Sequence, residues 1–300
     1  MGSGKGGAGK TFVAANLAAS LAASGQRVIA IDTDLESANL HTCLGIAPPR
    51  QGLADFVARR EEDLRKLAFE TPVTNLRLVA GTHGHLADAQ PDNARRVRLI
   101  RALRQLDADF VILDLATGMQ SATLDYFLVA DDGLLVVNPE PVSVENAYGF
   151  LRAAYYRRLR QAMVSQSLRE LITEVMDPRN EGGIRTPQEL FREIESTDPA
   201  EGARFVRTVS EFRPRIVING ARSAEDIRLG FSMVSVCRRY FGAELDYLGY
   251  INHDEAVRLS VAAREPLVTY AEQADAAIYL ERIARKISGP PPAVPTENSR

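Results

Sequence analysis

The sequence predicts an α/β protein with a mostly parallel sheet and helices on both faces. Short, continuously apolar segments typical of buried strands alternate with helical runs, and several of these segments end in aspartate or asparagine. The chain has 300 residues, of which 45% are hydrophobic and 25% are charged. This composition and length fit a folded protein with a substantial core and exclude a disordered, collagen-like or repeat protein.

The elements follow in order along the chain. An Ala-rich helix is expected from Thr11 to Ser24, where Gly25 ends it. A basic amphipathic helix is expected at 95–106 and a last helix at about 271–287. Six apolar segments are predicted to be strands: 27–31, 76–80, 109–113, 133–138, 215–219 and 245–251.

The strand ends predict where a ligand binds. In a parallel sheet with helices on both faces, ligands bind beyond the carboxyl ends of the strands. The residues that fall there are Asp32, Asp34, Asp114, Asn138 and Asn219. We therefore expect these side chains to gather at one edge of the sheet.

The organisation predicted is a single domain at 1–288 with a helical insertion. About 75 residues separate the fourth and fifth strands, which is more than one crossover helix needs. The polar part of this segment, about 155–212, is interpreted as a helical insertion. The proline-rich tail, 289–300, is expected to be disordered.

Charge and cysteine content limit the function classes. The net charge of −3 disfavours bulk attraction to nucleic acid or anionic lipid. The two cysteines, Cys43 and Cys237, are far apart and are expected to be buried core residues, not metal ligands or a disulfide. No stretch reaches about 18 apolar residues, and the three residues before Gly4 leave no room for a signal peptide. We expect a cytoplasmic protein.

One motif carries the chemistry. The segment Gly4-Lys5-Gly6-Gly7-Ala8-Gly9-Lys10-Thr11 fits the P-loop pattern GxxxxGK[ST] and opens the first helix. Its glycines allow backbone N–H groups to surround phosphate oxygens, and Lys10 brings a positive charge to the β- and γ-phosphates. The Thr11 hydroxyl is a ligand for Mg²⁺.

Lys5 adds a second lysine to this loop, and the form Lys-Gly-Gly-x-Gly-Lys-Thr resembles the deviant Walker A loop of the MinD/ParA family of P-loop ATPases. Further segments resemble that family: Ile31-Asp32-Thr33-Asp34 its first switch, Phe110 to Gly118 its Walker B strand and second switch, Asn138-Pro139-Glu140 its "NPE" turn, and Glu265-Pro266 a motif near its C-terminus. The sequence is most similar to MinD and FlhG-like proteins, and the implied fold is the P-loop NTPase fold of the SIMIBI, MinD-like type.

The resemblance implies a mechanism for an ATP- and Mg²⁺-dependent dimer. Two subunits would enclose two ATP molecules, and Lys5 would reach the partner's γ-phosphate, as an arginine finger does. Catalytic roles fall to Lys5, Lys10 and Asp34, with Asp34 positioning the attacking water. Thr11, Asp32 and Asp114 would hold the metal, the two aspartates through its waters. Gly118 would approach the γ-phosphate, and Asn219 would contact adenine.

Three features of the sequence depart from the family pattern. A P-loop follows a central strand of about five residues, but only Met1 to Ser3 precede Gly4, so we expect the first strand to be missing upstream of the P-loop. Phe12, at a nucleotide-binding position, replaces a second hydroxyl residue, which puts one α-phosphate contact in doubt. Asn252 replaces a proline on the adenine side.

Membrane and DNA surfaces stay open as partners but have no clear motif. The last helix combines Ala276, Leu280, Ile283 and Ile287 with basic neighbours, and we favour packing on the sheet over a membrane surface. Peripheral attachment to the inner face of the membrane is left open. The basic cluster Arg157, Arg158 and Arg160 is interpreted as a solvated helix face.

The remaining polar candidates receive structural interpretations. Asp125, Asp131 and Asp132 are expected to be helix caps or turn residues. His83 and His85 are expected to lie in an exposed loop, since no third metal ligand is evident, and His41 to be a packed histidine.

The function predicted is a dimerising ATPase switch that hydrolyses ATP slowly and positions or numbers a cellular structure through a regulatory partner. The partner surface expected is the insertion at 155–212. Alternatives are a metabolic enzyme of the dethiobiotin-synthetase type, a ParA-like DNA-partitioning ATPase, an iron–sulfur carrier and a scaffold that binds nucleotide without hydrolysis.

Overall fold

The computed structural model describes residues 1–81, 92–176, 183–184 and 186–289. The described strands form two sheets, with the orders β2-β3-β1-β4 and β5-β6-β7, and each pair is parallel except β2–β3. The predicted strands and the α/β class are confirmed, while the short antiparallel β2 was not predicted. The strands are β1 (Val28–Asp32), β2 (Phe69–Glu70), β3 (Leu76–Val79), β4 (Phe110–Asp114), β5 (Leu134–Val137), β6 (Arg215–Ala221) and β7 (Asp246–Asn252).

The two sheets meet at the first three residues of the sequence. The Gly2 amide donates to the carbonyl of Leu134 (2.8 Å), and the Val136 amide donates to the carbonyl of Gly2 (3.0 Å). On the other side, the Met1 amine donates to the Leu113 carbonyl at 2.5 Å, and the Leu115 amide donates to Met1 (3.1 Å). Residues 1–3 therefore lie between β4 and β5, as an isolated bridge directly before the P-loop.

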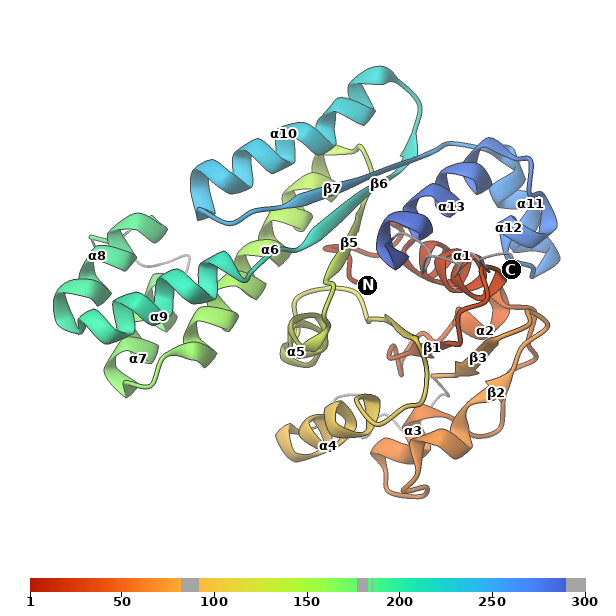
Figure 1. Ribbon diagram of the computed structural model, residues 1–300, viewed down its shortest axis with the longest axis horizontal. Helices are drawn as coiled ribbons and strands as arrows, with labels where there is room; N and C mark the ends of the chain where they lie inside the picture. The colour runs from red at the N-terminus through yellow and green to blue at the C-terminus, as the bar shows by residue number, and fades with distance from the viewer. Residues whose placement is uncertain (82–91, 177–182, 185, 290–300) are drawn as a thin grey trace, which may run out of the picture.

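The helices cover both faces of the sheets (Figure 1). The described helices are α1 (Lys10–Ala23), α2 (Leu40–Cys43), α3 (Leu53–Val57), η1 (Leu64–Leu67), α4 (Asn93–Leu103), α5 (Ser121–Val129), α6 (Pro141–Ala162), α7 (Gln166–Met176), α8 (Pro187–Thr197), α9 (Pro199–Ser210), α10 (Ala224–Phe241), α11 (Glu255–Ala263), α12 (Leu267–Tyr270) and α13 (Asp275–Ser288). The helices predicted at 11–24, 95–106 and 271–287 correspond to α1, α4 and α13.

Alternate residues of each strand face two separate cores. Ile29 and Ile31 of β1 pack with α3 to α6 and α10, whereas Val28 and Ala30 pack with α1, α2, α12 and α13. This alternation is what a strand covered on both faces requires. The second core includes Leu280 and Ile283 of α13, so the prediction that the last helix packs on the sheet is confirmed.

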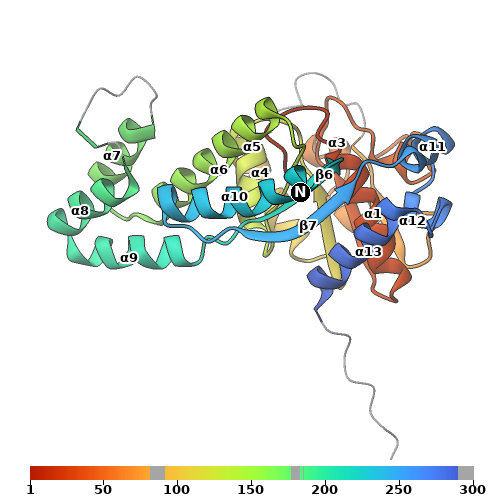
Figure 2. The same cartoon turned by 90° about the horizontal axis from the view of Figure 1, so that it is seen from above.

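The predicted insertion corresponds to a helical lobe, α7 to α9, that projects from one end of the molecule (Figure 2). Position 155 lies inside α6, which begins at Pro141, so the expected start of the insertion is not a structural boundary. Continuous helix instead carries the chain from the sheet into the lobe. Of the tail expected at 289–300, positions 290–300 lie outside the described residues.

The prediction for Asp125 was wrong, and in the basic cluster only Arg160 is exposed as predicted, whereas Arg157 and Arg158 are partly buried. Asp125 lies within α5 and accepts two hydrogen bonds from Arg157 of α6 (2.7 and 2.8 Å). Arg96 of α4 approaches the same carboxylate (3.5 Å), and Arg158 pairs with Glu211 (3.3 Å). These side chains join neighbouring helices, because a carboxylate on one helix reaches cations on two others.

Candidate functional site

The glycine-rich loop, Gly4 to Lys10, has the backbone that its sequence predicts. Gly7 and Gly9 have φ values of +83° and +81°, a left-handed conformation that side chains disfavour. Gly4 packs so closely on α6 that an added Cβ would lie 2.3 Å from the backbone of Asn146. The loop therefore needs glycine for two reasons: a left-handed turn and close contact with a helix.

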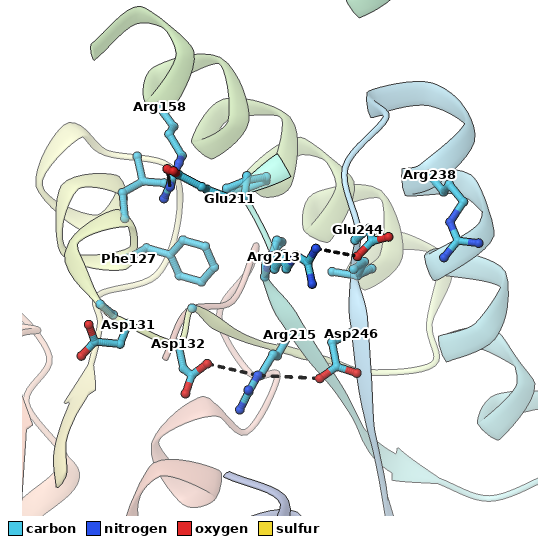
Figure 3. A pocket seen from close by; sticks show the side chains of 16 residues that line it. Phe127, Asp131, Asp132, Arg158, Glu211, Arg213, Arg215, Arg238, Glu244 and Asp246 are labelled. Carbon is cyan, nitrogen blue, oxygen red and sulfur yellow. Dashed lines mark hydrogen bonds and ion pairs between the residues drawn. The ribbon is translucent and has the colours of Figure 1, made fainter. Parts of the chain in front are cut away.

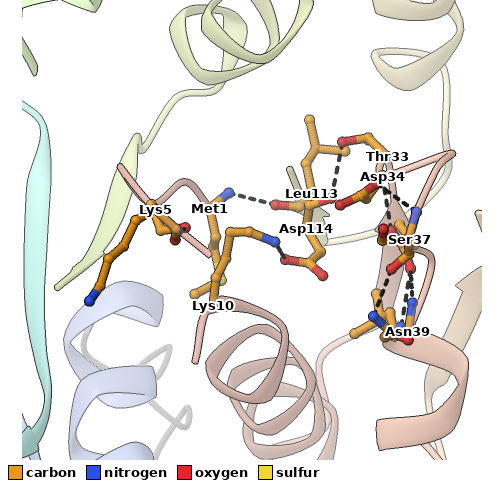
Figure 4. A network of polar contacts seen from close by, with 12 residues as sticks. Met1, Lys5, Lys10, Thr33, Asp34, Ser37, Asn39, Leu113 and Asp114 are labelled. Atoms are coloured by element: carbon orange, nitrogen blue, oxygen red, sulfur yellow. Dashed lines mark hydrogen bonds and ion pairs between the residues drawn. The ribbon is translucent and has the colours of Figure 1, made fainter. Parts of the chain in front are cut away.

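The two residues expected to serve phosphate and metal form a buried ion pair. Lys10 Nζ lies 2.5 Å from Asp114 Oδ1, and their side chains are 6% and 2% exposed (Figure 4). Lys10 is the first residue of α1, and Asp114 is the last residue of β4. The pair neutralises two charges that would each be costly to bury alone.

Asp32, at the end of β1, organises the segment that follows it. Its carboxylate accepts hydrogen bonds from the backbone amides of Asp34 (3.0 Å), Asn39 (2.9 Å) and Leu40 (3.1 Å). It thus closes the loop between β1 and α2. Burial and the neighbouring charge of Asp114 raise the pKa of Asp32 to about 7, although these hydrogen bonds oppose the shift.

Asp34 lies at the start of this loop and is partly exposed. Its Oδ1 accepts hydrogen bonds from the amides of Glu36 (3.2 Å) and Ser37 (2.9 Å), which fixes a local turn. The preceding Thr33 donates from its hydroxyl to the carbonyl of Asp114 (3.0 Å). The segment that carries Asp34 is therefore attached to both β1 and β4.

Lys5 takes a different direction from Lys10. Its Nζ lies 2.8 Å from Glu140 Oε2, just before α6, and the Lys5 side chain is 28% exposed. The P-loop thus presents one lysine inward to Asp114 and the other at its rim (Figure 4). The sequence indicated Glu140 only through the Asn-Pro-Glu turn and gave no sign of this pairing.

Asn219 and Phe12 have structural contacts at the predicted nucleotide site. The Asn219 side-chain amide donates to the Ala8 carbonyl (2.9 Å), which joins the end of β6 to the P-loop. Asn138 in turn donates to the Asn219 carbonyl (3.3 Å). The Phe12 side chain is buried in the core beneath α1, so this position offers a phosphate only its backbone.

The remaining predicted residues have distinct placements. Gly118 follows β4 with φ of +89°, and an added Cβ there would meet no atom within 4 Å. Thr11 is half-buried in the first turn of α1. Gly6 is open, since an added Cβ would contact nothing within 4 Å. Loop, switch segments and strand ends thus gather at the edge of the sheet.

The residues present fit a magnesium nucleotide. Left-handed glycines direct backbone amides toward an anion, and the N-terminus of α1 adds its positive dipole end. Thr11, Asp32 and Asp114 provide hydroxyl and carboxylate oxygens, which are the ligands that Mg²⁺ prefers. Register places Asp32 opposite Asp114 across β1 and β4, so the two carboxylates are neighbours.

Other candidates from the sequence do not join this site. Cys237 is buried and Cys43 half-buried, with burial raising the pKa of their thiols to about 12 and about 11. His41 is buried as predicted. His83 and His85 lie outside the described residues. Within the described ranges, no group of three or more His, Cys, Asp or Glu side chains could hold a metal ion.

Among the residues that the structure describes, no helix has the length and apolar character needed to span a membrane.

Comparisons with known proteins find a matching family model, related proteins and a similar solved structure. Residues 1–163 match a family model, AAA_31, described as an AAA domain. The antiactivator FleN of Pseudomonas aeruginosa is 28% identical over 97% of this chain and 86% of its own length. The septum site-determining protein MinD of Helicobacter pylori is 34% identical over 48% of this chain and 54% of its own. MinD of Pyrococcus horikoshii, solved with Mg-ADP, superposes with a TM-score of 0.65 at 21% identity, over 95% of this chain and 93% of that one.

Proposed function

Because the chain belongs to the AAA_31 family of AAA domains, and within it to the MinD/ParA class of P-loop ATPases, we propose that it is an ATP-driven molecular switch. The switch would dimerise with ATP, hydrolyse it slowly in a Mg²⁺-dependent reaction and separate afterwards. Its relatives are named as an antiactivator and as septum site-determining proteins. We therefore place its output in the positioning or numbering of a cellular structure.

The proposed mechanism assigns a task to each charged residue. With ATP bound, Lys10 would pair with the β- and γ-phosphates in place of Asp114, and the Asp114 carboxylate would then be available to hold Mg²⁺. Asp34 orients the attacking water, and Asp32 holds the Asp34 segment through its three backbone hydrogen bonds. Bound Mg²⁺ supplies charge neutralisation at the phosphate oxygens.

One observation carries the dimer proposal: the second lysine is at the rim of the loop. Lys10 already supplies the buried cation, whereas Lys5 is partly exposed and pairs with Glu140, whose side chain is 62% exposed. An exposed pair of this kind is weak, so it can be exchanged at low cost. Lys5 is thus available to neutralise phosphate charge across an interface between two copies.

The regulatory partner is proposed to contact the lobe within 155–212, because α7 to α9 are additional to the nucleotide-binding sheet. The lobe extends beyond the part of the molecule that carries the nucleotide-binding sheet (Figure 2).

The proposal is tested by the solution mass of an Asp34→Ala variant measured by light scattering with ATP and with ADP. Loss of Asp34 removes the residue that orients water, so ATP persists and the dimer accumulates. We expect a dimer with ATP and a monomer with ADP. Lys5→Ala in the same background is expected to bind ATP but to stay monomeric.

Two results would contradict the switch. A mass that does not respond to the nucleotide argues for an enzyme or scaffold that does not use dimerisation. A dimer that persists in the Lys5→Ala background removes the role assigned to that lysine. Binding of a fluorescent ATP analogue to both variants is the control, because it separates lost association from lost nucleotide binding.

A further inference from the structure

The outer side of α10 presents an aromatic ring among cations and hydroxyls. Arg228, Phe231, Ser235 and Arg238 occur at i, i+3, i+7 and i+10, so they follow one another along one side of the helix, and all are exposed. Arg239 lies beside them. We call Arg228, Phe231, Ser235, Arg238 and Arg239 the α10 surface.

Phe231 is 61% exposed, whereas Gly230 and Met233 of the same helix are buried. Among the described aromatic pairs, the only ring in contact with Phe231 is that of Tyr247 in β7. The two rings meet edge to face, with their centroids 5.0 Å apart. Gly230 makes room for Tyr247, since an added Cβ would lie 2.4 Å from that ring. Tyr247 fills the space beneath the helix, and most of the Phe231 ring remains free for another molecule.

The cations of this surface have no acidic partner. Across the described part of the chain, no carboxylate lies within ion-pair distance of Arg228, Arg238 or Arg239, whereas Arg157, Arg158 and Arg215 are paired. The helix dipole favours Arg238 and Arg239 near the C-terminus of α10. It opposes Arg228, which is the fifth residue of the helix. The helix dipole therefore does not explain the cation at position 228.

The helix that carries the surface is firmly positioned. Ser223 and Asp226 form a capping box at its start, and Gly242 ends it in a left-handed conformation. Met233 and Cys237 bury the opposite side in the core. The exposed side chains therefore project from a fixed scaffold, which lowers the ordering cost of binding.

We propose that the α10 surface docks an acidic segment of a partner protein that also carries an apolar side chain. Unpaired arginines recognise carboxylates, and Phe231 provides an apolar anchor of the kind found at protein interfaces. A nucleic acid is the weaker choice. The chain has a net charge of −3, and a duplex offers no apolar side chain for the exposed ring of Phe231. This inference rests on the proposed function only in requiring a protein partner.

The α10 surface is continuous with the base of the helical lobe. Arg238 lines a cavity of about 560 Å³ together with Arg158 of α6 and Glu211, which follows α9 (Figure 3). Because Asp131, Asp132, Glu244 and Asp246 also line this cavity, a segment that docks along α10 can extend toward α7 to α9 with its neutral or basic residues. The lobe and α10 then form one partner-binding side of the molecule.

The test is a selection from a displayed library of random peptides about 16 residues long, with the full chain immobilised and counter-selection against a Phe231→Ala, Arg228→Glu double variant. We expect enriched peptides to be rich in Asp and Glu around an aromatic or aliphatic residue. Their affinity should fall at least tenfold for the double variant and should decrease as salt increases.

A matched control is Val97→Ala with Arg101→Glu, which changes an exposed apolar residue and an exposed cation on α4. Its affinity for the same peptides should equal that of the wild type. Neutral or basic consensus sequences, or equal binding to both variants, would overturn the proposal. So would tighter binding of a short DNA duplex that the double variant loses.

The same variants separate this inference from the proposed function. ATP-dependent dimerisation, measured in the Asp34→Ala background, should be unchanged by substitutions at Phe231 and Arg228. Loss of peptide binding with intact dimerisation supports the α10 surface. Loss of both, with lowered thermal stability, would overturn the assignment, because Phe231 would then act through the fold.

Discussion

At the scale of single residues, two features of the surroundings of Asp32 have opposite effects on its carboxylate. As a buried acceptor for three amides it fixes the loop that carries Asp34, and as a neighbour of Asp114 it contributes a second negative charge to a small volume. Burial and that charge raise its pKa to about 7. Near neutral pH, the carboxyl is therefore close to its midpoint in the nucleotide-free protein.

This pKa predicts a pH dependence of the stability of the nucleotide-free protein. Between about pH 4 and pH 7 the folded state keeps a proton on Asp32 that the unfolded state has lost. The contribution of this group to the free energy of unfolding should therefore fall as pH rises through that range and level off above about pH 7. Urea unfolding of wild type and Asp32→Asn at several pH values measures it.

The informative quantity in that experiment is the difference between the two proteins. An asparagine has no proton to lose, so the stability of Asp32→Asn relative to wild type should rise as pH rises from 4 to 7. Parallel curves for the two proteins would show that Asp32 does not titrate there. Asp107→Asn, at an ion pair with Arg27 in which the Asp107 side chain is 83% exposed, is a suitable control.

At the scale of elements, the lobe depends on one buried carboxylate. Glu201 lies in the first turn of α9 and is 4% exposed, and its Oε1 accepts hydrogen bonds from the amides of Val164 (2.8 Å) and Ser165 (3.0 Å). Those amides precede α7, so the side chain satisfies the start of one helix from the start of another. Close packing at Gly202, where an added Cβ would lie 3.0 Å from Glu195 Cα, holds α8 against α9.

Replacing Glu201 with alanine should destabilise the lobe. Two backbone amides lose their acceptor, and the expected cost is roughly 1–3 kcal/mol in the free energy of unfolding. Glu193→Ala, at an exposed position of α8 in the same lobe, should change it by less than about 0.5 kcal/mol. Urea denaturation followed by circular dichroism compares the two; equal effects would contradict a capping role for Glu201.

At the scale of the whole molecule, few of the backbone hydrogen bonds between described residues join the two sheets. Between β4 and β5 the continuity passes through Met1 and Gly2, which bond to Leu113, Leu115, Leu134 and Val136. The ring of Phe150 packs beside Gly2 and meets Phe127 edge to face at 4.9 Å, which adds apolar contact at this junction.

This junction should open more readily than either sheet. The amides of Leu115 and Val136, which donate to Met1 and Gly2, are expected to exchange hydrogen faster than amides within β1, which is paired on both sides. Bound nucleotide should slow this exchange because it orders the adjacent P-loop. Equal protection of Val136 and of the β1 amides, by hydrogen-exchange measurements, would contradict the prediction.

The sequence predicted most of the strands and the P-loop because both are local signals. Apolar runs define β1 and β6, and the glycines of the loop appear directly in the pattern. Pairings between side chains that are distant in the sequence could not be predicted in this way. Lys5 with Glu140 and Arg157 with Asp125 depend on how helices cross, and no spacing along the chain encodes that. The start of the lobe was misplaced for a similar reason, since α6 continues without a break through position 155.

Helix α6 begins beside the P-loop, where Gly4 touches its backbone, and runs for 22 residues to the lobe. At 1.5 Å per residue this is a rod of about 33 Å. If α6 tilts by about 5° about its end beside the P-loop, its far end at the lobe moves by about 3 Å. Motion too small to disturb the core at one end can thus become a change of interface geometry at the other.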